Sequence, residues 1–339
     1  MTIGVHCAEV LFGEFNARQR TEHMIPLKVV AYFDGRIGHE KQTKGVLNAL
    51  SQRTPIDIEM RNVVPSLQSA IAQWGRYLSA AVIPDTKSGH IDLIVGTGSR
   101  VHIPMLLLKK RHGGKAVTCM TPDALLRNQM DLCFVPVHDQ VREGRNIFIT
   151  IGPPGITTDR GMHKMDRGLI LIGGIVNKKS RTWHSETAFS QVRTVIKKDS
   201  LKKWTITSSP RTPHEMCALL EQFASEKENV EFFSSRETPR GWIEDVYDRS
   251  ESVWVTADSI SMIYEALSAG CRVGIFPMPW KKKGGKFHRS EHYLIEKNMV
   301  TPYEAWVSGE RALPPPKPLN EAARCAEEIL KRWWPERLT

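Results

Sequence analysis

A loop with the sequence DGRIGHEKQ carries the clearest set of groups for proton transfer. It begins at Asp34, directly after a β-rich run. Because an imidazole is the side chain suited to proton transfer near neutral pH, His39 is the candidate base for a hydroxyl, while Asp34 would hold the turn or orient the ring. Gly35 and Gly38 permit a tight turn and a close approach of a ligand to the backbone. The competing interpretation is that Asp34 only caps the next helix and that His39 is a surface residue.

Other predicted strand ends in the first half of the chain carry further polar groups. Gly98 and Ser99 lie in the loop GTGSR and form a glycine- and serine-rich rim. This loop lacks the third glycine of a dinucleotide-binding turn, so a dinucleotide cofactor is not expected. The alternative bases at these strand ends are Asp123, His138 and Asp139.

The second half of the chain holds groups suited to a diphosphate. Gly173 and Gly174 end a predicted strand, and Arg211 stands with Ser208 in the hydroxyl-rich run TSSPRTP. Backbone amides, hydroxyls and a guanidinium together predict a diphosphate cradle.

A third loop, TADSISM, leads into a helix and adds hydroxyls to this cradle. Ser259 and Ser261 lie at the predicted helix start. Glu265 follows Ser261 by four residues on the same helical face, where its carboxylate would accept hydrogen bonds from ribose hydroxyls. The competing interpretation is an ordinary solvated glutamate.

Two motifs later in the chain resemble known sites only in part. The run PMPWKKKGGKFHR is a solvated loop or one that reaches phosphates, but Trp280 and Phe287 replace the glycine and the hydroxyl of a P-loop. His288 and His292 fit the H-x-x-E-H pattern of zinc peptidases. Because a zinc site also needs a third ligand from another element, we expect no metal.

Short β-rich runs alternate with amphipathic runs after residue 26, an order typical of parallel sheets covered by helices. The predicted strands are 28–33, 56–60, 91–95, 116–119, 132–135, 146–151, 169–172, 204–207, 230–233, 242–247, 253–256 and 272–276. The predicted helices are 40–50, 66–80, 101–111, 186–197, 213–224, 259–269 and 320–334. The fold class is therefore α/β, with two doubly wound, Rossmann-like lobes and a cleft between them.

The positions of proline and glycine place the expected boundaries of these lobes. Residues 1–26 form an N-terminal extension, and 27–155 form the first lobe. A linker at 156–167 leads to the second lobe at 168–312. Residues 313–339 form a C-terminal helix that packs back on the first lobe.

Composition excludes several classes of protein. With 41% hydrophobic and 25% charged residues among 339, the chain is globular rather than disordered or fibrous. No apolar run approaches the roughly 18 residues of a membrane-spanning helix, and the N-terminus lacks a signal-peptide pattern. Six isolated cysteines indicate reduced, buried thiols of a cytosolic protein. The net charge of +10 favours anionic partners such as phosphates, nucleic acid or an acidic membrane surface.

Taken together, the loops resemble a known family. This family is the bacterial relatives of the plant mitochondrial-fission Elm-type proteins, which are grouped as glycosyltransferases of the GT-B fold. The matching pieces are DGRIGHEKQ, GTGSR, FVPVHD, LIGG, TSSPRTP and TADSISMIYEALSAG, in the expected order from about residue 27 to 278. Ile175 and Val176 stand where the family usually has Pro-Ser, and Pro210 stands where it tends to have a second arginine.

The resemblance implies an acceptor in the first lobe and a nucleotide-diphosphate sugar in the second. It places Gly173, Gly174, Ser208 and Arg211 at the diphosphate, Ser259 and Ser261 at the phosphate or sugar, and Glu265 at the ribose. The acceptor-side set is Gly35, Gly38, Gly98, Ser99 and His138.

Glycosyl transfer to a cell-envelope glycan or lipid-linked acceptor is the expected activity. The donor is a substrate, so no cofactor is expected, and no nucleic acid partner is implied. The expected location is cytoplasmic, peripheral on the inner face of the plasma membrane through its anionic surface. A catalytically silent GT-B scaffold that binds a protein partner or a membrane is the alternative.

Overall fold

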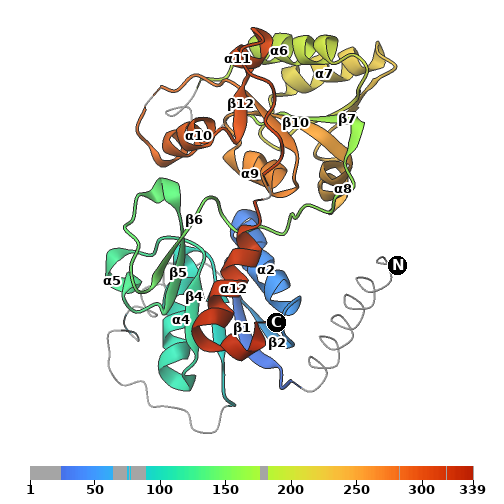
Figure 1. Cartoon of the computed structure of the whole chain (residues 1–339). Coiled ribbons are helices and arrows are strands. Elements are labelled where there is room, and N and C mark those ends of the chain that lie inside the picture. Colours follow the sequence, from blue (N-terminus) through green and yellow to red (C-terminus); the bar gives the residue numbers. More distant parts are fainter. Residues whose placement is uncertain are drawn as a thin grey trace, which may run out of the picture. The chain divides into compact units, whose positions relative to one another are not determined.

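The chain divides by its contacts into two compact units (Figure 1). The computed structural model describes residues 24–63, 75, 77, 89–175, 182–281, 283–317 and 319–338. Unit 1 is formed by Met1–Ile156 with Glu321–Thr339, and unit 2 by Thr157–Asn320. Almost all of the predicted extension 1–26 and of the predicted helix 66–80 lies outside the described residues.

Unit 1 contains a six-stranded parallel sheet in the order β2-β1-β3-β4-β5-β6. Its strands are β1 (Leu27–Phe33), β2 (Ile56–Asn62), β3 (Leu93–Gly96), β4 (Lys115–Thr118), β5 (Leu132–Pro136) and β6 (Ile147–Thr150). Its helices are α2 (Ile37–Ser51), α4 (Ser99–His112), α5 (Ala124–Arg127), α12 (Glu321–Trp333) and the short 3₁₀ turns η1 (Val137–Asp139) and η2 (Pro335–Arg337).

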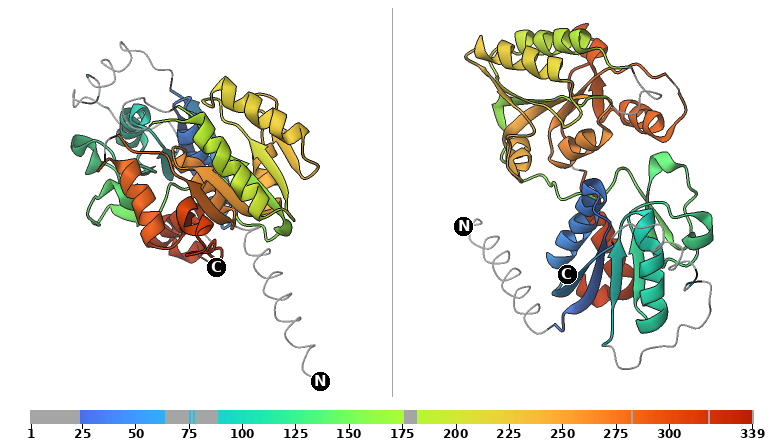
Figure 2. Two further views of the ribbon diagram at one scale, coloured as in Figure 1. Left: turned by 90° about the horizontal axis from the view of Figure 1, so that it is seen from above. Right: turned by 180° about the vertical axis from the view of Figure 1, so that it is seen from behind.

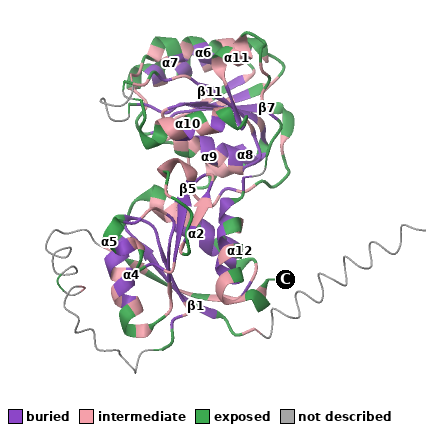
Figure 3. Cartoon of the chain, turned by 60° about the vertical axis from the view of Figure 1, so that its left-hand side comes forward, coloured by how far each residue is buried: buried purple, intermediate pink, exposed green. Residues whose placement is uncertain are grey.

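Alternation along β1 explains how helices cover both faces of this sheet. Val29 and Ala31 pack into one apolar core with α2 and α12, while Val30 and Tyr32 pack into another with α4. Side chains in a strand point alternately to opposite faces, so an almost wholly apolar strand such as β1 must be buried on both sides. Figure 3 shows the resulting buried strands at the centre of each unit.

The C-terminal helix α12 returns to unit 1 and lies beside α2 (Figures 1 and 2). Trp333 and Trp334, which follow the apolar stripe of the helix, are partly buried against the same core. Arg337 donates hydrogen bonds to Thr54 Oγ1 at 2.9 Å and to the Ile25 carbonyl at 3.0 Å. The end of the chain is therefore tied to unit 1. Among the described residues, no helix is both long and apolar enough to cross a bilayer.

Unit 2 contains a second six-stranded parallel sheet in the order β12-β11-β10-β7-β8-β9. Its strands are β7 (Lys164–Leu171), β8 (Lys203–Thr207), β9 (Val230–Phe233), β10 (Ser250–Thr256), β11 (Arg272–Phe276) and β12 (Val300–Pro302). Its helices are α6 (Ser185–Lys198), α7 (His214–Ser225), α8 (Trp242–Arg249), α9 (Ile260–Ser268), α10 (Lys286–Glu296) and α11 (Tyr303–Val307). In Figure 1, α6 and α7 cover one face of the sheet, and α8 and α9 cover the other.

The predicted α/β class with two doubly wound, Rossmann-like units is confirmed. The strand predicted at 242–247 is wrong, because this segment forms helix α8. Val246 and Tyr247 lie about one turn after Trp242, and Glu244 and Asp245 occupy the first turn, so the segment is an amphipathic helix. Helices α10 and α11 and the three-residue strand β12 were not predicted. Strand β7 begins at Lys164, inside the segment 156–167 expected as a linker.

Candidate functional site

The loop between β1 and α2 holds an aspartate and a histidine in direct contact. The Asp34 side chain is fully buried, and one of its oxygens accepts a hydrogen bond from the Arg36 amide at 3.1 Å. The other oxygen lies 2.8 Å from His39 Nδ1. A carboxylate can only accept, so Nδ1 of the neutral ring carries the hydrogen and Nε2 keeps its lone pair. Asp34 therefore both holds the turn and orients the imidazole, which is 24% exposed.

Gly98 on the neighbouring β3–α4 loop packs against this pair. Its φ is +114°, and a Cβ built there would lie 2.5 Å from Asp34 Oδ2 and 2.6 Å from His39 Nδ1. Only glycine fits this backbone conformation and this space. A Cβ built at Gly38, in the first turn of α2, would instead meet no atom within 4 Å. Ser99 is exposed at the start of α4.

A buried histidine that the sequence patterns did not single out lies in the first turn of α4. His102 is fully buried, and its Nε2 lies 3.1 Å from Thr118 Oγ1. Burial lowers the pKa of its imidazole to about 4, with a smaller opposing effect from Asp123. His102 is therefore neutral at physiological pH.

His138 lies in the turn η1 that follows β5. Its Nε2 is 3.7 Å from Asp139 Oδ1, and Asp139 accepts a hydrogen bond from Thr121 Oγ1 at 2.7 Å. The structure thus brings two of the alternative bases together at one strand end.

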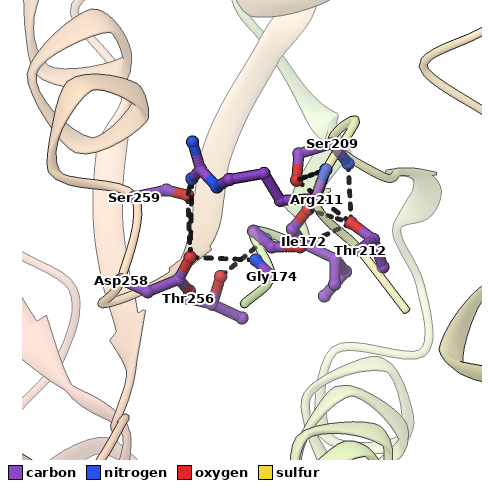
Figure 4. A network of polar contacts seen from close by, with 9 residues as sticks. Ile172, Gly174, Ser209, Arg211, Thr212, Thr256, Asp258 and Ser259 are labelled. Atoms are coloured by element: carbon purple, nitrogen blue, oxygen red, sulfur yellow. Dashed lines mark hydrogen bonds and ion pairs between the residues drawn. The ribbon is translucent and has the colours of Figure 1, made fainter. Parts of the chain in front are cut away.

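In unit 2, three loops meet where β7, β8 and β10 end (Figure 4). The Gly173 amide donates to Thr256 Oγ1 at 2.7 Å, and the Gly174 amide donates to Asp258 Oδ2 at 2.9 Å. Both amides expected at a diphosphate thus bind side chains, one at the end of β10 and one in the β10–α9 loop. A Cβ at Gly174 would lie 2.0 Å from the Arg211 carbonyl oxygen, so this glycine allows one loop to pack on another.

Asp258 is the centre of this network, and the sequence patterns did not identify it. Its side chain is 2% exposed and accepts a hydrogen bond from Ser259 Oγ at 3.2 Å. Arg211 Nη2 lies 3.7 Å from Asp258 Oδ2 and donates to Ser259 Oγ at 3.1 Å (Figure 4). The Arg211 side chain remains 47% exposed. The network therefore holds a guanidinium at the surface where the strands end.

The remaining residues predicted for the donor differ in their surroundings. Ser208 is buried, and its hydroxyl accepts a hydrogen bond from the Ser235 amide at 3.1 Å. Ser261 is exposed in the first turn of α9, and Glu265 is half-buried one turn later. Glu265 lies close to the buried phenol of Tyr247. The pKa of Tyr247 is raised well above its usual value, mainly by burial and to a smaller extent by this carboxylate. The sequence patterns did not predict this contact, because its two residues belong to different helices, α8 and α9.

The H-x-x-E-H motif lies on α10. Its central carboxylate, Glu291, accepts a hydrogen bond from Trp280 Nε1 at 3.0 Å, and the rings of His288 and His292 are 6.4 Å apart. No group of three metal-ligating side chains is found in the part of the chain that the structure describes.

The sequence model described as "Mitochondrial fission ELM1" matches residues 37–333, which include His39 and the loops of unit 2 but begin after Asp34. The chain belongs to the mitochondrial fission ELM1 family. A search of curated proteins finds no match.

Solved structures similar to this ELM1-family chain have the GT-B fold. UDP-GlcNAc 2-epimerase from Methanocaldococcus jannaschii aligns with a TM-score of 0.54 and 12% identity over 91% of this chain and 99% of the other. The glycotransferase of kitacinnamycin aligns with 0.50 and 13% over 93% and 100%. UDP-GlcNAc 2-epimerase from Neisseria meningitidis, bound to UDP-GlcNAc, aligns with 0.50 and 10% over 90% and 99%. The expected GT-B architecture is thereby confirmed.

Gly174→Ala tests the contact between loops in this ELM1-family protein. The added Cβ meets backbone rather than a flexible side chain, so the loops must move apart. We expect a loss of about 1–3 kcal/mol in the free energy of unfolding, as is typical of overpacking. Urea unfolding measures it, with Gly285→Ala as the control because a Cβ there meets no atom within 4 Å. Equal stability of Gly174→Ala and wild type would contradict the packing argument.

Proposed function

We propose that this protein transfers a glycosyl group from a nucleotide-diphosphate sugar to a hydroxyl of a cell-envelope glycan or lipid-linked acceptor. The observation that carries the proposal is the contact of a buried Asp34 with a partly exposed His39, 2.8 Å apart, at the carboxyl end of β1. Ligands of open α/β sheets bind beyond the carboxyl ends of strands, so the pair stands where acceptor chemistry is expected.

In the proposed reaction, His39 Nε2 removes the proton of the acceptor hydroxyl. The acceptor oxygen then forms a bond to the anomeric carbon of the sugar. The bond from that carbon to the phosphate oxygen breaks, and its electron pair leaves with the nucleoside diphosphate. Asp34 keeps the imidazole in the required tautomer and stabilises the imidazolium that forms.

The donor is proposed to bind at the loops of unit 2. The half-exposed Arg211 guanidinium supplies a cation for phosphate oxygens. Ser259 is buried and its hydroxyl donates to Asp258, so it would contribute a donor only by exchanging this partner. Gly173 and Gly174 would contribute their amides only by exchanging their present partners, Thr256 and Asp258. The two neighbours that act on UDP-GlcNAc support a nucleotide sugar as the ligand class.

Turnover of candidate donors separates transfer from the silent scaffold. UDP-GlcNAc is the first donor to test, followed by other nucleotide sugars, and release of nucleoside diphosphate is the readout. Activity should persist in EDTA, because Arg211 is proposed to neutralise the diphosphate and no divalent ion is then required. A complete loss in EDTA that manganese restores would contradict this assignment. Nucleotide binding without release of diphosphate from any donor would favour the scaffold.

Glu265→Gln tests the proposed ribose contact. Replacing the carboxylate with an amide removes a charged acceptor, so UDP should bind more weakly by about 1–3 kcal/mol. Isothermal titration with UDP gives the affinity. Thermal unfolding checks that the variant stays folded although its contact with Tyr247 is altered. Glu296→Gln is the control, since that side chain is 64% exposed on α10. Unchanged UDP affinity in Glu265→Gln would remove this residue from the site.

Contact with an anionic membrane at the cytoplasmic face is also proposed, through the basic segment that leads into α10. Lys281, Lys283 and Arg289 belong to this segment, whereas Trp333 and Trp334 pack on unit 1. Replacing the three cations with alanine should weaken co-sedimentation with anionic vesicles, since each cation near the surface contributes about 1 kcal/mol. Equal binding of the wild type to anionic and neutral vesicles would exclude this contact.

A further inference from the structure

One face of the β7–β8–β9 part of the unit 2 sheet is polar. Trp204 and Ile206 of β8 and Val230 of β9 point into the core beneath α6 and α7. Because side chains alternate along a strand, Thr205 and Glu231 point to the opposite face. These two residues are also register partners on neighbouring strands. Glu231 is exposed and Thr205 is half-buried, so helices cover this part of the face only in part.

A cavity of about 230 Å³ lies over this face. Its floor includes Gly168 and Thr205, and helix α8 forms one wall with Trp242, Val246 and Arg249. The cavity is lined by Lys164, Arg167 and Gly168 of β7. Gly173 and Gly174 instead follow the carboxyl end of that strand. The cavity is therefore distinct from the proposed donor loops.

Three cations and one carboxylate line the cavity. The cations are Lys164, Arg167 and Arg249, and the carboxylate is Glu231. Arg167 has one acidic neighbour, Asp166, at 3.9 Å, and its own side chain is 40% exposed. Within the described residues, neither Lys164 nor Arg249 forms an ion pair with a carboxylate. The cavity thus has an excess of positive charge that an anion would neutralise.

The aromatic residues of the cavity add an apolar surface beside these cations. The rings of Phe233 and Trp242 lie 5.0 Å apart at 54°, and both side chains are only partly buried. Arg249 is held by a hydrogen bond from its Nε to the Asp245 carbonyl at 3.1 Å. A guanidinium that lines the same cavity as an aromatic pair suits a ligand with a charged group at one end and a flat apolar body at the other.

We propose that this cavity binds a small organic anion, a phosphate or carboxylate attached to a ring. Its volume is below the ~300–1,000 Å³ that is usual for drug-sized ligands, which favours a single ring. The charged group contacts Arg167, Arg249 and Lys164, and the ring packs against Trp242. This binding requires neither the donor loops nor glycosyl transfer.

Isothermal titration of the full chain with phenyl phosphate, benzoate and inorganic phosphate tests the proposal. Arg167→Ala and Arg249→Ala should each weaken the binding of phenyl phosphate by at least about tenfold, the loss expected for one charged hydrogen bond. Trp242→Ala should weaken phenyl phosphate and benzoate but leave inorganic phosphate nearly unchanged. Loss for benzoate as well as for phenyl phosphate in the arginine variants would indicate that any anionic head group is accepted.

Two matched variants locate the binding event. Arg193→Ala removes a cation of α6 outside the cavity, and Arg211→Ala removes the guanidinium of the donor loops; neither should change the affinity for phenyl phosphate by more than about twofold. Three results would overturn the proposal. They are no saturable binding of phenyl phosphate or benzoate up to on the order of 10 mM, equal affinity of wild type and both cavity arginine variants, and a loss confined to Arg211→Ala. Circular dichroism of each variant confirms that the fold is retained.

Discussion

His39→Ala is expected to lower kcat by about 10²–10⁴, while the affinity for the nucleotide donor changes little. The imidazole is the only side chain of the Asp34–His39 pair with exposed surface, because the Asp34 side chain is fully buried. Removing it abolishes proton transfer from the acceptor but leaves the loops of unit 2 intact. Steady-state kinetics with saturating donor gives kcat, and titration with UDP gives the donor affinity.

Two further variants make this result specific. Asp34→Asn retains the shape of the turn but weakens control of the imidazole tautomer, so kcat should fall while UDP affinity stays unchanged. His90→Ala removes a histidine whose side chain is 76% exposed and should leave kcat at the wild-type value. A near-wild-type kcat in His39→Ala, with a large loss in Asp123→Ala or His138→Ala, would move the base to another strand end.

The fold was predictable where periodicity and length agree. Strand β1 is a run of seven residues with almost no polar interruption, and α6 has a clear apolar stripe. The segment of α8 was not predictable in the same way, since its eight residues contain both β-branched and aromatic types and fit either pattern. Strand β12 has three residues and is defined by pairing with β11, a contact that no local pattern reveals.

In the candidate site, only the contacts between residues of the same loop were predictable from the sequence. Asp34 and His39 lie five residues apart in one turn, so their contact follows from local geometry. Asp258 binds Gly174 across 84 residues, and Tyr247 approaches Glu265 from a different helix. These contacts depend on which strands are neighbours in the sheet. The contacts of Gly174 with Asp258 and with the Arg211 carbonyl could not be predicted for the same reason, and its place at the diphosphate stays a prediction.

His102 is expected to make unit 1 less stable as the pH falls from 6.5 towards 4. Burial holds its pKa at about 4 in the folded protein, against an ordinary value of 6.5. Between these two values the unfolded chain binds a proton that the folded chain does not, so protonation favours unfolding. Stability from this group is fully present above pH 6.5 and is lost as the pH falls to about 4. The loss amounts to about 3 kcal/mol.

Hydrogen exchange of β3 and β4 peptides in urea, corrected for the intrinsic exchange rate at each pH, measures this loss in unit 1 alone. His102→Gln retains a group that can hydrogen-bond to Thr118 Oγ1 but cannot titrate. Between pH 7 and 4, the free energy of unfolding of this variant should therefore fall by about 3 kcal/mol less than that of the wild type. His292→Gln is the control, because that side chain is 71% exposed on α10 of unit 2. The same pH dependence in wild type and His102→Gln would show that His102 is not the group responsible. Acid sensitivity of unit 1 would then come from its carboxylates.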